Sequence, residues 1–172
     1  TRISEESHLK PKPMIEIGGM PIIWHIMKLY LHHGFHEFII CAGYKQYMIK
    51  EYFANYAMYK SDITFDFSEC EQRIFIHNSH AEPWKVTVID TGQNTMTGGR
   101  IKRIEQYLED KPFMVTYGDG VSNVDIKELT RFHKAHGKIM TLTGVQPEGR
   151  FGAMDFSMDG CIRSFREKNE ED

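Results

Sequence analysis

The sequence has few cysteines, no long apolar run and no excess of positive charge, and each absence excludes a class of protein. Cys41, Cys70 and Cys161 are far apart and form no CxxC pair, so we expect no disulfide framework and a reducing, cytoplasmic setting. No apolar run approaches the length of a membrane span, so we expect no membrane partner. A net charge of −3 argues against a nucleic-acid partner.

The sequence also lacks internal repeats, low-complexity linkers and any composition shift that would mark a boundary. Its 172 residues are 41% hydrophobic, which is enough to bury a sizeable core. We therefore expect a single domain over residues 1–172.

The order of helical and strand patterns predicts an α/β fold. Apolar residues at helical spacing predict helices at 21–33, 44–56, 98–108 and 124–137. Almost wholly apolar runs predict strands buried on both faces at 38–43, 113–120 and 139–145, as in a parallel sheet. This alternation predicts a Rossmann-like, mixed but mostly parallel sheet with helices on both faces.

Residues 61–90 have a different pattern. The stretches 63–67, 73–77 and 86–90 alternate apolar and polar side chains with period two. Such alternation is typical of antiparallel strands with one exposed face. We expect a small antiparallel insertion beside the main sheet, and further short strands within 151–165.

The segment TYGDG follows a predicted buried strand and carries a carboxylate between two glycines. In open α/β sheets, ligands bind outside the carboxyl ends of the strands. Asp119 could hold a hard divalent cation at that position, and the cation could in turn hold phosphates. An ordinary Asp-Gly turn is the alternative explanation of this segment.

Two further segments could contact a nucleotide. In residues 91–104, a turn rich in Gly and Thr runs into a helix, and Arg100 adds a charge in its first turn; a capped helix start with a basic face is the alternative. Near the start, Lys12 lies between two prolines that hold the chain extended; a solvated basic loop is the alternative. His133 and His136 lack a suitably spaced third ligand, which favours a surface position over a metal site.

Taken together, these segments resemble the sugar-1-phosphate nucleotidylyltransferases over essentially the whole chain. The matching motifs, in order, are TR…PKPM, GYK, TG…MTGGR, YGDG and EK. The motifs EPW, DTG…MTGGR and FHKAHGK resemble the cytidylyl branch, whose members transfer a cytidylyl group from CTP to glucose 1-phosphate. The resemblance implies a nucleotide-diphospho-sugar transferase fold, CTP and glucose 1-phosphate as partners, Mg²⁺ as cofactor and a homo-oligomer.

The resemblance implies that four residues act on the phosphates. Thr1 and Arg2 would end a glycine-rich loop that wraps the triphosphate, with Arg2 gripping its oxygens. Lys12 would reach the phosphates where the new bond forms, and Asp119 would bind Mg²⁺. Arg2 and Lys12 are therefore the expected catalytic residues.

The resemblance implies that Thr95 and Arg100 help to hold the nucleotide, and that Glu167 and Lys168 belong to the sugar-phosphate motif. Asn169 stands where the family has a proline. The family also has a first strand with a glycine-rich turn before Thr1, and a second metal-binding Asp and an oligomerisation region after Lys168. We therefore expect 1–172 to be an incomplete nucleotidylyltransferase domain. Sister enzymes using UTP or dTTP, and an inactive binding-only fragment, are the alternatives.

Overall fold

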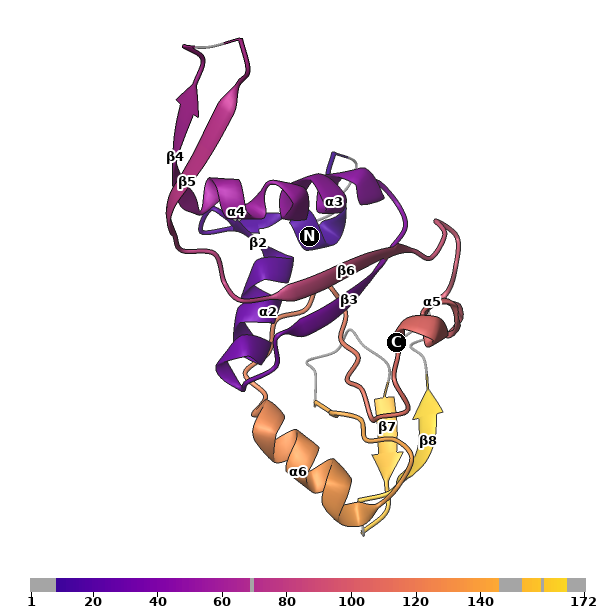
Figure 1. Ribbon diagram of the computed structural model, residues 1–172. Helices are drawn as coiled ribbons and strands as arrows, with labels where there is room; N and C mark the ends of the chain where they lie inside the picture. Colours follow the sequence, from indigo (N-terminus) through magenta and orange to yellow (C-terminus); the bar gives the residue numbers. More distant parts are fainter. Residues whose placement is uncertain (1–8, 69, 146–152, 159, 167–172) are drawn as a thin grey trace. The chain divides into compact units, whose positions relative to one another are not determined.

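The computed structural model describes residues 9–68, 70–145, 153–158 and 160–166, which form two units divided between Ile126 and Lys127 (Figure 1). The first unit contains η1 (Lys12–Met14), β1 (Glu16–Ile17), β2 (Met20–Pro21), α2 (Ile22–His32), β3 (Glu37–Ala42), α3 (Gln46–Ala54), α4 (Tyr56–Tyr59), β4 (Ser61–Asp66), β5 (Arg73–Ser79), β6 (Lys85–Asp90), α5 (Thr97–Arg103) and η2 (Glu105–Tyr107). The second contains most of α6 (Ile126–His136), then β7 (Ala153–Phe156) and β8 (Ile162–Arg166), which pair antiparallel. The single-domain organisation stays a prediction.

The mixed α/β class is confirmed, with parallel and antiparallel strand pairs and helices between them. The central pair joins β3 and β6 in parallel, in an unbroken register from Glu37 opposite Lys85 to Ala42 opposite Asp90. Helices α3 and α4 lie in the connection between the two strands, as a parallel crossover requires. Among the residues described, no helix combines the length and the apolar character that crossing a bilayer demands.

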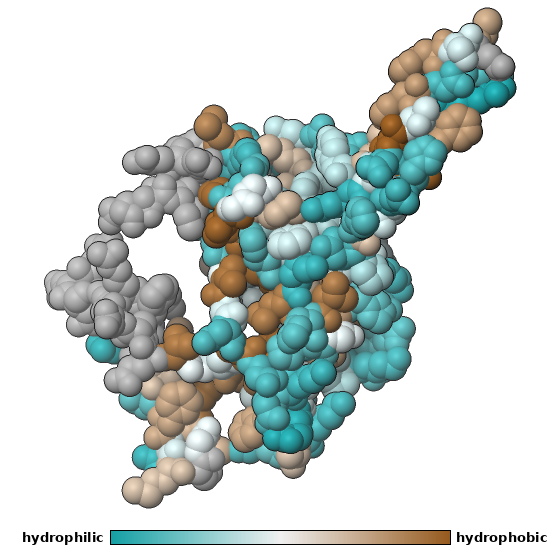
Figure 2. Space-filling view, turned by 90° about the vertical axis from the view of Figure 1, so that its left-hand side faces the viewer, coloured by the Kyte–Doolittle hydropathy of each residue, from teal (hydrophilic) through white to brown (hydrophobic). Residues whose placement is uncertain are grey.

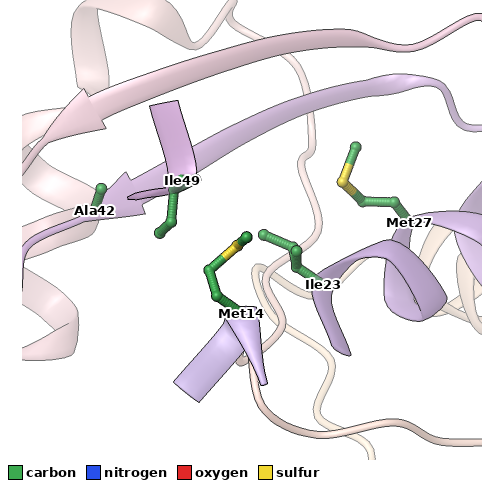
Figure 3. Close-up of a cluster of buried hydrophobic side chains, with 5 residues drawn as sticks. All are labelled: Met14, Ile23, Met27, Ala42 and Ile49. Atoms are coloured by element: carbon green, nitrogen blue, oxygen red, sulfur yellow. The ribbon is translucent and has the colours of Figure 1, made fainter. Parts of the chain in front are cut away.

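The core lies on one face of this strand pair. A cluster of buried side chains brings together Met14 from η1, Ile23 and Met27 from α2, Ala42 from β3 and Ile49 from α3 (Figure 3). Alternate residues of both strands pack against the cluster: Phe38, Ile40, Val86 and Val88. The period of two along the strands and the helical spacing in α2 therefore direct their apolar side chains into one cluster.

The local patterns predicted α2 and α6 well, but the single helix expected at 98–108 is wrong, because α5 ends at Arg103 and only the 3₁₀ turn η2 follows. Helix α2 begins after Pro21, and its chain turns out of the helix at Gly34, which has φ 91°. Helix α6 is followed by Gly137, with φ 66°. At both positions the left-handed backbone suits glycine, which has no Cβ to clash with the following carbonyl.

The expected assignment of 86–90 to the antiparallel insertion is wrong. These residues belong to β6, which pairs parallel with β3. Alternation with period two reports only that one face of a strand is more buried than the other. It does not encode which strand is the partner, because pairing depends on contacts distant in sequence.

The strands expected within 113–120 and 139–145 are also wrong. Both segments are described in full, and neither forms a strand. Their apolar side chains are exposed, with Val115 at 58% and Ile139 at 102%. An apolar run becomes a buried strand only when neighbours pair its backbone and cover both its faces, and the described residues provide no such neighbours here.

The hairpin β4–β5 confirms the rest of the insertion. The two strands pair antiparallel, with Phe65 opposite Ile74 and Ile63 opposite Ile76, so one face is apolar. Among the described residues nothing covers that face: Phe67, which continues it, is 71% exposed. Apolar side chains are visible along the arm at the upper right of Figure 2.

Candidate functional site

The segment that carries Lys12 has a fixed backbone and a partly exposed side chain. Residues 12–14 form a single 3₁₀ turn, closed by the Met14 amide donating to the Pro11 carbonyl at 2.8 Å and the Ile15 amide to the Lys12 carbonyl at 3.1 Å. Met14 is buried in the core. The Lys12 side chain is 56% exposed. The turn therefore presents an ammonium to solvent from a rigid base.

The segment that carries Asp119 is held against the same turn. A Cβ on Gly118 would lie 2.8 Å from Cγ of Pro13, which is closer than real Cβ atoms approach. Upstream, the hydroxyl groups of Thr116 and Tyr30 are hydrogen-bonded, and partial burial raises the pKa of Tyr30. Glycine at position 118 thus allows the proline ring to contact the backbone next to Asp119.

These two contacts bring Lys12 and Asp119 together. The Lys12 Nζ lies 3.6 Å from Oδ2 of Asp119, and both side chains are partly exposed. An exposed ion pair of this kind contributes only about 0–1 kcal/mol to folding. Both charges can therefore change partners at small energetic cost when a charged ligand arrives.

A metal at Asp119 would need ligands beyond the described protein side chains. Within the described ranges, no group of three or more His, Cys, Asp or Glu side chains could hold a metal. Mg²⁺ is commonly bound through one or two carboxylates, with waters and substrate phosphates completing the shell. One partly exposed carboxylate fits that mode and does not fit a metal cage built by the protein alone.

Thr91 and Arg100 lie at the carboxyl ends of β3 and β6. Thr91 is completely buried, and both its amide and its hydroxyl donate to the Ala42 carbonyl at 2.9 Å. The Arg100 Nη1 donates to Oγ1 of Thr91 at 2.6 Å and to the Ala42 carbonyl at 3.2 Å, and its Nη2 donates to the Gln93 carbonyl at 3.1 Å. The guanidinium thus ties α5 to the ends of both strands.

Thr95 has a comparable structural contact. Its hydroxyl accepts a hydrogen bond from Nη1 of Arg103 at 2.8 Å, and the same nitrogen donates to the Thr91 carbonyl at 2.6 Å. The left-handed turn at Gly92 brings its backbone so close to Arg103 that a Cβ there would lie 2.5 Å from Nη1. The roles of Thr95 and Arg100 toward a nucleotide stay predictions. Thr91 and Arg103 were missed, although the i, i+3 spacing of the two arginines places them on one helix face.

Asp90, at the last position of β6, is another carboxylate that the sequence reasoning missed. Hydrogen bonds from the Gln46 side chain and from the Gly92 amide lower its pKa below the usual range. It is therefore an ionised group at the end of a parallel strand, where ligands of α/β folds bind.

The EPW motif lies in a polar network of the fold and not at the Lys12–Asp119 pair. Glu82 accepts hydrogen bonds from the Tyr56 hydroxyl and from Nζ of Lys28, the latter at 3.1 Å. Partial burial opposes its ionisation, but these bonds prevail and lower its pKa. Trp84 stacks on Tyr56 with ring centroids 5.5 Å apart. The motif therefore has a packing role.

The remaining predicted residues divide into two groups. Four lie outside the described residues: Thr1, Arg2, Glu167 and Lys168. The two histidines of α6 are described, and their rings lie 2.8 and 2.7 Å from the same hydroxyl, that of Thr141. Because a hydroxyl both donates and accepts hydrogen bonds, Thr141 can bond to either the neutral or the protonated form of each histidine.

Comparison with known proteins identifies the class of this chain. A family model described as "Nucleotidyl transferase" matches residues 1–172, so the chain belongs to the nucleotidyl transferase family. It is 57% identical to the glucose-1-phosphate cytidylyltransferase of Salmonella typhi and 40% identical to the probable glucose-1-phosphate cytidylyltransferase of Bacillus subtilis. Both alignments cover 100% of this chain but only 66% of the relative's length.

A solved structure agrees at the level of the fold. HddC from Yersinia pseudotuberculosis, complexed with GMP-PN, superposes with a TM-score of 0.63 at 23% identity. The match covers 94% of this chain and 61% of that one.

Proposed function

We propose that the protein transfers a cytidylyl group from CTP to glucose 1-phosphate, giving CDP-glucose and pyrophosphate. The observation that carries the proposal is the 3.6 Å separation between the Lys12 ammonium and the Asp119 carboxylate, both of which are partly exposed. The similarity to glucose-1-phosphate cytidylyltransferases supports the choice of substrates. We also propose a homo-oligomer, on the strength of the same resemblance, and a cytoplasmic location, on the strength of the few and widely spaced cysteines.

The chemistry requires little covalent participation by the protein. An oxygen of the sugar phosphate attacks the α-phosphorus of CTP, the bond to the β-phosphate oxygen breaks, and pyrophosphate leaves. The attacking phosphate is already ionised at neutral pH, so no general base is needed. The protein must hold two polyanions together and stabilise charge at the phosphorus. Lys12, on its rigid turn, would supply that positive charge.

Asp119 would hold Mg²⁺ through a carboxylate oxygen, the ligand type that this ion prefers. When bound, the ion would supply Lewis-acid stabilisation of phosphate charge. Lys12 would neutralise Asp119 in the absence of the metal, which follows from their present contact.

The test compares Asp119→Asn and Lys12→Ala with a matched lysine control. Asp119→Asn should lower kcat/KM by about a hundredfold or more, as expected for a group that stabilises transition-state charge. Lys12→Ala should lower kcat more than it weakens CTP binding. Lys85→Ala serves as the control, because Lys85 is an exposed lysine that pairs with Glu37 at 2.9 Å and not with Asp119. Near-normal turnover by Asp119→Asn at saturating Mg²⁺ would contradict the metal assignment.

A nucleotide panel tests the substrate. CTP should be used with far greater efficiency than UTP or dTTP, because a site that pairs the exocyclic amino group of cytosine rejects a base that lacks it. Comparable efficiency with UTP or dTTP would favour a sister enzyme. Binding of CTP without turnover would favour an inactive fragment.

A further inference from the structure

The turn that follows β3 contains a residue in an unfavourable backbone conformation. Lys45, between Tyr44 and the first residue of α3, has φ 48° and ψ 35°. Among the described residues it is the single non-glycine residue with positive φ. Lysine gains nothing from this left-handed conformation, which glycine adopts at no steric cost. Such strain persists where surrounding contacts compensate for it, and it often marks a functional position.

The Lys45 side chain provides the compensating contact. Its Nζ donates a hydrogen bond to the Leu9 carbonyl at 2.8 Å and lies 5.3 Å from the centroid of the Tyr44 ring. The bond is charge-assisted, which makes it stronger than one between neutral groups. It joins the turn after a central strand to a backbone atom three residues before Lys12.

The segment around Lys12 is therefore held from two sides. Downstream, the Met14 side chain is buried in the core and the Pro13 ring packs against Gly118. Upstream, the Lys45 ammonium bonds the Leu9 carbonyl, and Lys10 forms an exposed ion pair with Glu16. An exposed pair such as Lys10–Glu16 contributes only about 0–1 kcal/mol, so we expect the Lys45 bond, which grips the backbone itself, to be the main upstream restraint on the position of Lys12.

We propose that Lys45 is a positioning residue, which fixes residues 9–12 so that the Lys12 ammonium stays beside Asp119. The inference rests on the proposed function for its effect on turnover, but its effect on the backbone is independent of any activity. Lys45 acts through Lys12 and does not need to touch the substrate.

The test uses three variants of Lys45 and one control. Lys45→Met keeps the strained backbone and most of the side chain but removes the ammonium. Lys45→Gly removes the side chain and also the strain, so a merely structural role predicts an intact or more stable fold. Lys45→Arg keeps a cationic donor. Lys85→Met is the control, because Lys85 is an exposed lysine that pairs with Glu37.

The readout that needs no activity is amide hydrogen exchange at Met14 and Ile15, whose amides close the 3₁₀ turn. Lys45→Met and Lys45→Gly should raise exchange at these two amides about tenfold or more, while Lys45→Arg and Lys85→Met stay near the wild-type rate. In the CTP assay, the first two variants should lose about 10- to 100-fold in kcat, the range expected for a displacement near 1 Å, with KM for CTP little changed.

Unchanged exchange in Lys45→Met would overturn the inference whatever the kinetics. A raised KM for CTP with unchanged exchange and kcat would also overturn it, since Lys45 would then be a direct phosphate ligand. Raised exchange in Lys45→Met and Lys45→Gly, combined with no turnover of CTP by the wild-type protein, would support the positioning role and contradict the proposed function.

Discussion

Substituting Gly118 by alanine should separate the two charges of the candidate site. The added Cβ would meet Cγ of Pro13 at 2.8 Å and its Cβ at 3.3 Å, whereas ordinary contact begins at 3.4 Å. The proline ring must therefore retreat by about 0.6 Å or more, or the Gly118 backbone must move by the same amount. The ring is rigid, so the shift passes to the adjoining Lys12 or to Asp119.

The expected result is a larger loss of activity than of stability. Overpacking of this size costs about 1–3 kcal/mol in the free energy of unfolding, while a misplacement approaching 1 Å costs up to about a hundredfold in rate. We expect kcat for CTP and glucose 1-phosphate to fall about 10- to 100-fold, with urea denaturation showing a protein that is still folded.

The control is Gly120→Ala on the other side of Asp119. A Cβ there would have no atom within 4 Å, and neither Gly118 nor Gly120 has the positive φ that would strain an alanine. Equal kcat values for the two variants would refute the view that contact between Pro13 and Gly118 sets the position of Lys12.

Three further predictions concern the fold around the site. Met27→Ala should lower the free energy of unfolding in urea by about 2–5 kcal/mol, because the side chain is 2% exposed in the main cluster; a loss well under 1 kcal/mol would contradict this. Thr91→Val should cost about 1–3 kcal/mol by leaving the Ala42 carbonyl and Arg100 without the hydroxyl, and Thr91→Ser should restore most of it. Burial raises the pKa of Tyr52 from 10.0 to about 12. The contribution of neutral Tyr52 to the free energy of unfolding is therefore fully present below pH 10 and is lost as the pH rises from 10 to about 12. Tyr52→Phe should therefore flatten the fall of Tm with alkaline pH, and an unchanged slope would contradict the assignment.

The elements that the sequence predicted are those whose signals are local. Helix α2 has apolar residues at helical spacing between a proline and a glycine, and β4 and β5 alternate with period two. Such signals depend on nearby residues alone. The parallel pairing of β6 and the exposed course of 113–117 depend on which strands lie alongside, which no local pattern specifies.

The candidate site was predicted unevenly for the same reason. Lys12 and Asp119 were chosen through a resemblance, and the structure brings them together, although neither spacing nor periodicity predicts contact between residues so distant in sequence. Arg100 was expected to face a nucleotide, but its described hydrogen bonds go to the protein's own backbone and to Thr91. Side-chain contacts of this kind form only after the strand ends have met.

The attachment of α5 has a consequence for proteolysis. This seven-residue helix contains two glycines and lacks a side-chain cap among its described contacts, so it is too short and too weak a helix former to persist alone. Arg100 and Arg103 hold it to the strand ends through backbone carbonyls. The same two arginines are trypsin cleavage sites. Trypsin can cut there only after the guanidinium groups leave the carbonyls, so the rate of cleavage in native buffer measures how often this edge of the sheet opens.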